Sequence, residues 1–187
     1  DYKVTGVQTC ALPIYGYDAA MRRDRPWFKT WSQDGKQSNL TAAINIIREF
    51  EGTVLTAYRC PAGVWTIGTG NTRYTDGSPV KQGDKITPVE ADMMLRMEVD
   101  RIAATLSKQV PYWGEMTDNQ KSALISFAYN LGEHFYGTSG FGTISACLRE
   151  KRWSDVPSAL LLYRNPGSSF EVGLKRRRVA EGKLWAA

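Results

Sequence analysis

The sequence predicts an α+β domain in which a small β-containing lobe comes first along the chain and a larger helical lobe follows. Residues 53–75 are rich in Val, Thr, Tyr and Trp and are punctuated by Pro and Gly. This composition is typical of a small antiparallel sheet with tight turns. From residue 88 onward, apolar residues recur at helical spacing. Because the two patterns are segregated along the chain, they favour an α+β architecture.

The length and composition are those of one globular domain. The chain has 187 residues, of which 42% are hydrophobic and 23% are charged. These values exclude a wholly disordered chain, a collagen-like chain and a disulfide-stapled miniprotein. No stretch approaches about 18 consecutive apolar residues, so the sequence predicts no membrane-spanning helix.

The net charge of +5 is concentrated at the C-terminal end of the chain. Residues 149–187 hold nine basic and four acidic side chains, whereas the first 148 residues hold fifteen of each. A basic surface favours an anionic partner such as nucleic acid, acidic lipid or cell wall. A solvated helix face with some Arg residues in structural pairs explains the same charge. Because +5 is modest for a nucleic-acid binder, we expect no nucleic-acid partner.

The N-terminal residues are set apart from the domain. Residues 1–20 show no usable helical or strand periodicity, and their VTGVQTCALPI stretch resembles translated adapter or cloning sequence. We expect this segment to be a non-native or disordered extension. Residues 21–38 are polar, aromatic and turn-rich, which predicts an irregular arm or linker. Residues 39–187 are expected to form the folded domain.

The first helix of the domain is predicted from its cap and its apolar face. Asn39 can cap it, and Leu40, Ala43, Ile44 and Ile47 fall on one side. Gly52 is expected to end this helix directly after Glu51.

Two capping boxes predict the starts of the next helices. Thr87 to Glu90 begins a long helix, which is expected to join the lobes beside a ligand-binding cleft. Thr117 to Gln120 begins another, which Gly132 ends. Shorter helices are expected over residues 142–151, 154–163 and 171–185.

Three residues of the first lobe are candidates for chemistry. Glu51 lies at a helix end directly before the β segment. A partly buried Glu there could act as a general acid near neutral pH, although an exposed helix-end Glu has the same pattern. A tight hairpin at Pro61–Gly63 could bring Cys60 and Thr66 together. A lone Cys in a strand is more commonly a small buried apolar residue.

The run EGTVLTAYRCPAGVWTIGTGNT, which starts at Glu51, resembles the phage-type lysozymes of glycoside hydrolase family 24. The signature of that family is Glu, eight residues, Asp or Cys, five residues and Thr, followed by a T-x-G-x-G hairpin. Glu51, Cys60 and Thr66 have this spacing, with Cys in place of the catalytic Asp. The resemblance covers residues 39–187, including MTDNQKSALISFAYNLG at 116–132 and GLKRRRVAEGKLW at 173–185.

The resemblance implies a lysozyme-like fold and a phage endolysin that cleaves the β-1,4 bond between N-acetylmuramic acid and N-acetylglucosamine in peptidoglycan. Glu51 would be the general acid, Cys60 would bind or activate the attacking water, and Thr66 would orient it. Inversion at the anomeric carbon is then expected. Because a free thiol is mostly protonated at pH 7, we expect Cys60 mainly to orient water or to stabilise positive charge developing at the sugar.

The resemblance also suggests supporting residues. Asn71 follows the hairpin, and Tyr129 and Asn130 lie on the helix that lines the family's cleft, so all three are candidate substrate contacts. The C-terminal helix is expected to supply a cation near Glu51, from Lys175 or Arg176. For Arg177 and Arg178, a solvated basic face explains the charge at least as well as a role near Glu51.

The sequence predicts no metal or other cofactor. Cys10, Cys60 and Cys147 match no zinc motif, and the single His cannot complete a typical ligand set. The resemblance implies a monomer made in the cytoplasm of a bacterial host. It would act on peptidoglycan in the periplasm after release across the inner membrane.

Two alternative functions use other residues. A cysteine-dependent peptidoglycan amidase or peptidase would use Cys60 as nucleophile and His134 as base. A non-catalytic protein would instead bind the anionic wall or membrane through the basic helix at 174–185. Iodoacetamide sensitivity together with full activity of Glu51→Gln would favour the first alternative, and killing retained by Glu51→Gln would favour the second.

Overall fold

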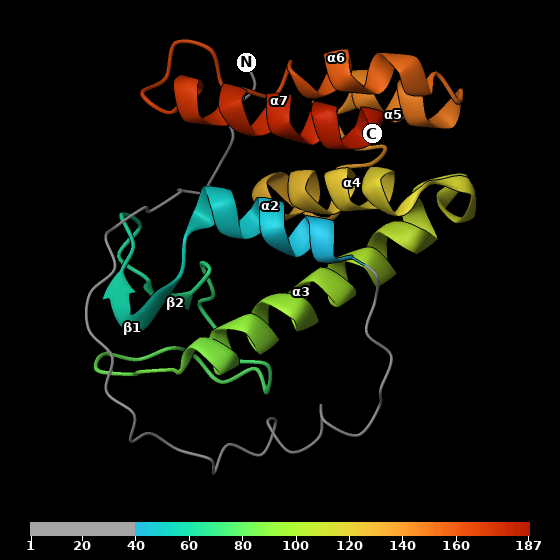
Figure 1. The fold of residues 1–187 in the computed structure, drawn as a ribbon. Coiled ribbons are helices and arrows are strands. Elements are labelled where there is room, and N and C mark those ends of the chain that lie inside the picture. Colours follow the sequence, from blue (N-terminus) through green and yellow to red (C-terminus); the bar gives the residue numbers. More distant parts are fainter. Residues whose placement is uncertain (1–39) are drawn as a thin grey trace. The chain divides into compact units, whose positions relative to one another are not determined.

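The computed structural model describes residues 40–187, and these divide into two compact units (Figure 1). The sheet unit consists of residues 47–98, and the helical unit consists of residues 40–46 and 99–187. Helices α2 (Thr41–Glu51) and α3 (Pro88–Gln109) contribute residues to both units. The predictions for residues 1–20, for residues 21–38 and for the Asn39 cap lie outside the described part of the chain.

The sheet unit is built on an antiparallel hairpin. Strands β1 (Val54–Arg59) and β2 (Trp65–Gly68) pair so that Tyr58 lies opposite Thr66, with an irregularity in β1 between Val54 and Tyr58. Residues 84–86 pair with β1 as well: the Ala57 amide donates to the Asp84 carbonyl at 2.8 Å, and the Ile86 amide donates to the Leu55 carbonyl at 2.9 Å. The predicted antiparallel sheet is therefore confirmed, although residues 69–75 form turns and isolated bridges.

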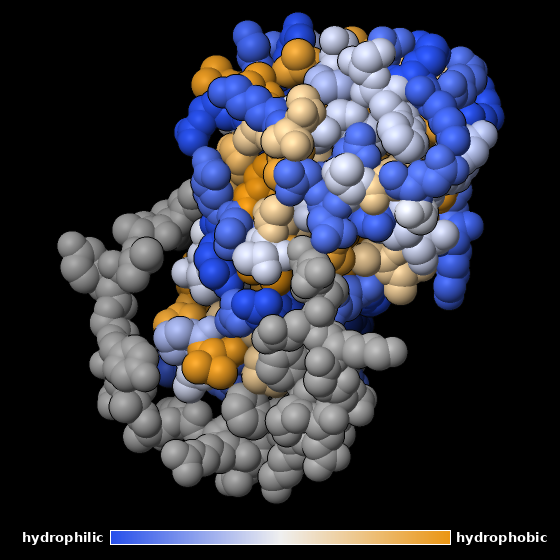
Figure 2. All heavy atoms as spheres, turned by 45° about the vertical axis from the view of Figure 1, so that its right-hand side comes forward, coloured by the Kyte–Doolittle hydropathy of each residue, from blue (hydrophilic) through white to orange (hydrophobic). Residues whose placement is uncertain are grey.

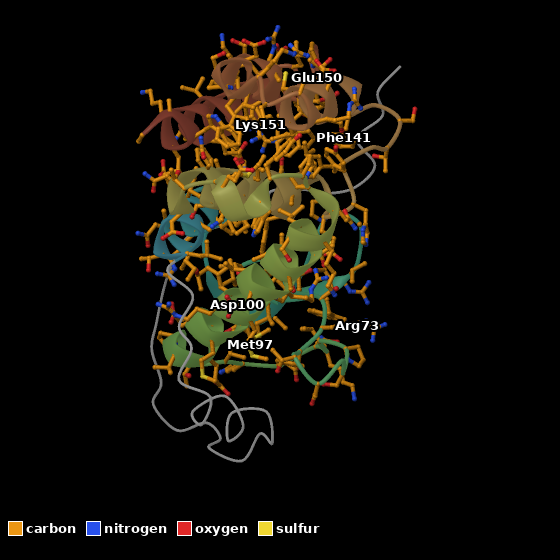
Figure 3. All side chains as sticks on the ribbon, turned by 90° about the vertical axis from the view of Figure 1, so that its right-hand side faces the viewer. Arg73, Met97, Asp100, Phe141, Glu150 and Lys151 are labelled. Carbon is orange, nitrogen blue, oxygen red and sulfur yellow. The ribbon has the colours of Figure 1, made fainter. Side chains whose placement is uncertain are left out.

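One side of this sheet carries the core of its unit. Leu55, Ala57 and Trp65 pack against a buried apolar cluster. That cluster consists of Ile67, Tyr74, Val80, Ile86, Ala91, Met93 and Met94. Arg73, which follows β2 in the chain, projects outward (Figure 3). Met97 and Asp100 lie on successive turns of α3 (Figure 3). The Arg73 guanidinium donates to the Gly77 carbonyl at 2.9 Å, which closes the turn between them.

Both predicted capping boxes are present. At the start of α3, the Thr87 amide donates to the Glu90 carboxylate at 2.7 Å, and the Glu90 amide donates to the Thr87 hydroxyl at 3.2 Å. At the start of α4 (Asp118–Leu131), Thr117 and Gln120 make the same reciprocal pair. Gly132 ends α4 with φ 103°, as expected.

The helical unit also contains α5 (Gly142–Arg149), α6 (Val156–Leu160) and α7 (Glu171–Ala186), with short 3₁₀ turns at Trp113–Glu115 and Trp153–Asp155. Helix α7 packs against both α4 and α6 (Figure 1). The aromatic core of the helical unit consists of Phe127, Phe135, Phe141 and Tyr163. The ring centroids of its contacting pairs lie 5.0–6.0 Å apart.

Two predicted helices are shorter than expected. Helix α5 ends at Arg149 rather than residue 151, because Lys151 adopts a left-handed backbone with φ 53°. Helix α6 spans only Val156–Leu160 rather than 154–163. A 3₁₀ turn precedes it, and the backbone forms turns instead of α-helix after Leu160. Helical spacing of apolar residues does not distinguish a short α-helix from an adjoining 3₁₀ turn.

The surface of the helical unit is mixed in character. On the face shown in Figure 2, hydrophilic side chains predominate, with smaller hydrophobic patches between them. Among residues 40–187, no helix combines the length and the apolar character needed to span a bilayer.

Candidate active site

Glu51 is the last residue of α2, and it is only 9% exposed. Gly52 follows with φ 68°, and its amide donates to the Arg48 carbonyl at 3.0 Å. This left-handed glycine closes the last helical turn and redirects the chain toward β1. The predicted helix end is confirmed, and Glu51 is not an exposed helix-end side chain.

Cys60 and Thr66 lie on facing arms of the hairpin. The Cys60 amide donates to the Val64 carbonyl at 3.0 Å, and the Gly63 amide donates to the Cys60 carbonyl at 2.7 Å. The Thr66 hydroxyl donates to the Val64 carbonyl at 3.1 Å and lies in a side chain that is 3% exposed. It also lies within hydrogen-bonding reach of the Cys60 side chain. The tight turn therefore brings these two side chains together.

The surroundings of Cys60 favour the thiolate. Partial burial raises the pKa of the Cys60 thiol, but hydrogen bonds from the backbone of Val64 and Ala62 and from the Thr66 side chain outweigh it. The pKa of Cys60 is consequently lowered from that of an ordinary thiol. A larger share of Cys60 is ionised near neutral pH than in a free cysteine.

Asn71 lies at the opposite end of β2 from Cys60. Ile67 and Asn71 exchange two backbone hydrogen bonds of 2.9 Å, which close the turn after the strand. A side chain on Gly68, whose φ is 67°, would place its Cβ 3.0 Å from the Asn71 side-chain oxygen. The lack of a side chain at Gly68 therefore leaves room for the Asn71 side-chain oxygen. Asn71 belongs to the sheet unit with Glu51, Cys60 and Thr66.

Tyr129 and Asn130 lie on α4, in the helical unit. Tyr129 is half-buried. Asn130 is 1% exposed, and its side-chain oxygen accepts a hydrogen bond of 2.9 Å from Arg178 on α7. The Asn130 side chain is thus engaged in the α4–α7 interface, and contact of Tyr129 or Asn130 with substrate stays a prediction.

The expectation of a solvated basic face at Arg177 and Arg178 is wrong. Both side chains are buried, and both form ion pairs with the buried Glu181, at 3.2 Å and 2.9 Å respectively. Arg177 also donates to the Ser126 carbonyl at 3.1 Å. Because α7 packs against α4 and α6, these charges are removed from water and need partners within the protein.

Sequence reasoning missed Glu181 as the centre of this cluster. Its spacing of four residues from Arg177 and three from Arg178 is the signal that pairs them on one helix face. Lys175 and Arg176, the expected source of a cation near Glu51, are exposed.

The chain matches the phage lysozyme family over residues 48–181, which is most of its length. It belongs to the phage lysozyme family. An endolysin of Acyrthosiphon pisum secondary endosymbiont phage 1 is 35% identical over 144 residues, covering 75% of this chain and 92% of that protein. An endolysin of Bacillus phage PZA is 33% identical over 146 residues, covering 77% of this chain and 53% of that protein.

A SAR-endolysin of Escherichia phage 933W is 40% identical over 85 residues, which is 45% of this chain and 46% of that protein. The chain thus spans about half the length of two of these relatives.

Solved structures support the same family. An endolysin from Escherichia coli O157:H7 phage FAHEc1 has a TM-score of 0.67 and 30% identity, covering 80% of this chain and 92% of that one. The muramidase domain of SpmX from Asticaccaulis excentricus has a TM-score of 0.66 and 28% identity, covering 81% of this chain and 98% of that one. The expected lysozyme-like α+β fold is confirmed.

In this phage lysozyme, His134 belongs to the helical unit. Its Nδ1 atom lies 2.7 Å from the Gln109 side-chain nitrogen, and its Nε2 atom lies 3.5 Å from a Glu133 oxygen. The His134 side chain is 71% exposed, so these contacts orient it without burying it. Within residues 40–187, no group of three or more His, Cys, Asp or Glu side chains is placed to hold a metal ion.

Proposed function

We propose that this phage lysozyme is an N-acetylmuramidase that cleaves the β-1,4 bond between N-acetylmuramic acid and N-acetylglucosamine and acts as an endolysin in host cell lysis. As a family member it is a glycoside hydrolase of the lysozyme type that acts on peptidoglycan. The observation that carries the residue assignment is the sheet unit itself, which holds a buried Glu51 together with the Cys60–Thr66 pair.

Glu51 is assigned as the general acid. Breaking the glycosidic bond leaves negative charge on the departing oxygen, and a positioned acid neutralises it by transferring a proton. Such an acid contributes about 10²–10⁴-fold to the rate. The low exposure of Glu51 and the closed last turn of α2 restrict where its carboxyl can lie, as this role requires.

Cys60 and Thr66 are assigned to the attacking water. A Cys60 thiolate can accept a hydrogen bond from water and take its proton as the oxygen attacks the anomeric carbon. The thiolate also places negative charge near the positive charge that develops on the sugar. The lone pairs of the Thr66 hydroxyl can accept a hydrogen bond from the same water.

This division of roles predicts inversion at the anomeric carbon. Glu51 protonates the leaving oxygen while Cys60 directs water to the opposite face of the sugar, so the configuration changes in one displacement. The proton donor Glu51 and the water-directing Cys60 are both side chains of this protein. Proton NMR of freshly released fragments would show the α-anomer first if the reaction inverts.

Other contacts of the substrate belong to the same proposal. Asn71 and Tyr129 are candidates for direct contact with the glycan. Asn130 would support the substrate-binding face of α4 through its bond to Arg178.

We also infer that the basic C-terminal helix contacts an anionic wall or membrane. The exposed residues of α7 include Lys175, Arg176 and Lys183, and the acidic Glu181 of the same helix is buried. The protein would work as a monomer on peptidoglycan in the periplasm, after release from the host cytoplasm.

The muramidase assignment is tested by the clearing of permeabilised Gram-negative cells. Wild type, Glu51→Gln and the control Glu49→Gln are compared, because Glu49 is an exposed carboxylate on the same helix. Wild type and Glu49→Gln should clear the cells, and Glu51→Gln should not. Mass spectrometry should then find fragments with N-acetylmuramic acid at the reducing end.

The same experiment separates the two alternatives. A cysteine-dependent amidase or peptidase using Cys60 would release peptides instead of glycan fragments, and Glu51→Gln would remain active. A non-catalytic protein would kill cells equally well as Glu51→Gln and release no fragments.

A further inference from the structure

The connection between Glu51 and β1 runs through Gly52 and Thr53. Gly52 lies between the end of α2 and β1, and its φ is 68°. Glycine has the widest backbone freedom of any residue, so the covalent connection alone constrains the direction of α2 weakly. A second contact is needed to hold the Glu51 carboxyl at a constant place relative to the hairpin.

Arg48 supplies such a contact one helical turn before Glu51. Its carbonyl accepts the Gly52 amide at 3.0 Å, which closes the last turn of α2. Its guanidinium donates to one carboxylate oxygen of Asp92 on α3. Arg48 therefore belongs to the turn that carries Glu51 and is also bound to a second helix.

The start of α3 is in turn bound to the sheet. Residues 84–86, directly before α3, form backbone hydrogen bonds with Ala57 and Leu55 of β1. The Thr87–Glu90 capping box fixes the entry into the helix. Because β1 leads directly to Cys60, these contacts complete a closed path from Glu51 through Arg48, Asp92 and β1 to Cys60.

We propose that Asp92 is a positioning residue that holds the last turn of α2, through Arg48, so that Glu51 keeps its place relative to Cys60 and Thr66. The inference rests on the proposed function of these three residues. Asp92 touches none of the reacting atoms in this scheme and acts only through Arg48.

Arg96 provides a matched control on the same carboxylate. Its Nε donates to the second oxygen of Asp92 at 2.7 Å, but both residues lie on α3, four positions apart. The Asp92–Arg96 pair therefore stabilises one helix without connecting two elements. Removing Arg96 costs an ion pair of the same kind and leaves the link from α2 to α3 in place.

The expected effect is a loss in kcat with little change in KM. The Arg48 and Asp92 side chains are 43% and 35% exposed, and a partly exposed ion pair favours one arrangement only modestly. Asp92→Asn and Arg48→Gln should each lower kcat about fivefold, because the competent arrangement is populated less. KM should stay within about twofold, since neither variant alters a proposed substrate contact.

The experiment measures kcat and KM on a soluble peptidoglycan fragment for wild type, Asp92→Asn, Arg48→Gln, Arg96→Gln and the double variant Arg48→Gln/Asp92→Asn. Arg96→Gln should keep kcat near that of wild type, and the double variant should lose no more than either single variant. Asp92→Glu, which restores a carboxylate, should recover part of the loss. Circular dichroism and thermal melts identify any variant that fails to fold.

Two results would overturn the inference. One is an Asp92→Asn variant that is folded and has wild-type kcat. The other is an Arg96→Gln variant that loses as much kcat as Arg48→Gln, since that indicates a general effect on α3. If wild type is active and Glu51→Gln is inactive while Asp92→Asn is unaffected, only the positioning role fails. If Glu51→Gln is fully active, the proposed function fails and the inference fails with it.

Discussion

The guanidinium of Arg178 on α7 donates a hydrogen bond to the side-chain oxygen of Asn130 on α4, 2.9 Å away, inside an interface where both residues are buried. The same guanidinium lies over the Phe127 ring at 4.9 Å and pairs with Glu181 at 2.9 Å. One arginine thus joins α7 to two residues of α4 while neutralising a buried carboxylate.

Replacing this arginine should destabilise the helical unit strongly. Arg178→Met leaves the Asn130 oxygen and part of the Glu181 carboxylate without their partner in a dry interface. Breaking a buried ion pair from one side costs about 3–5 kcal/mol. The free energy of unfolding, measured by chemical denaturation, should fall by that amount.

The exposed Lys183 on the same helix provides the control, because Lys183→Met should change stability by less than about 0.5 kcal/mol. Equal losses for the two variants would show that the charge on α7 matters and the buried pairing does not.

Cys60 should react with iodoacetamide at lower pH than an ordinary thiol. Hydrogen bonds from the Val64 and Ala62 backbone and the Thr66 side chain lower the pKa of Cys60 despite its partial burial. Only the thiolate is alkylated, so the rate should rise with pH and level off above this lowered pKa. Thr66→Val removes one hydrogen bond and should shift the midpoint upward.

These rates are best measured with Cys10→Ser as the background, followed by mass spectrometry of the modified peptide. Cys147 is buried and serves as an internal control that should react slowly. A midpoint at the usual thiol pKa, unchanged by Thr66→Val, would rule out stabilisation of the Cys60 thiolate by the hairpin.

Cys60→Asp should keep substantial muramidase activity. A carboxylate at this position is ionised at neutral pH and can orient water or stabilise positive charge at the sugar, as proposed for the thiolate. Cys60→Ser conserves size but carries no negative charge, so it should lose about 10²-fold in kcat. Turnover of a soluble fragment gives both values, and a folded Cys60→Asp variant with little or no turnover would contradict the electrostatic role.

Two glycines on α7 should respond differently to the same substitution. A Cβ on Gly182 would lie 3.2 Å from the Pro157 Cβ and 3.4 Å from its Cα, whereas a Cβ on Gly173 meets nothing within 4 Å. Gly173→Ala should stabilise the protein by about 0.5–1 kcal/mol through helix propensity. At Gly182 the rigid proline ring and backbone cannot yield easily, which offsets that gain.

Thermal melts of the two variants measure this difference. Gly182→Ala should be at least about 1 kcal/mol less stable than Gly173→Ala, within the range of overpacking costs. Equal stability would show that α6 can move away from α7 without cost.

Local features of the fold were predictable because their causes lie within a few residues. The Thr87–Glu90 and Thr117–Gln120 capping boxes form as expected, since each satisfies amide groups only three positions away. Gly52 ends α2 for the same kind of local reason. The length of α6 was not predictable, because the 3₁₀ turn that precedes it has nearly the same apolar spacing.

The sequence by itself determined the family and predicted Glu51, Cys60 and Thr66 as its catalytic candidates, because their spacing along one helix end and one hairpin is a local property. Only the tertiary structure decided which charges are buried. Arg177 and Arg178 follow two exposed basic residues in the sequence, yet packing of α7 against α4 and α6 removes them from water and pairs them with Glu181.

The link from Arg48 to Asp92 likewise joins residues 44 positions apart. Such contacts depend on how helices and strands pack against one another, and no local pattern of residues determines that packing.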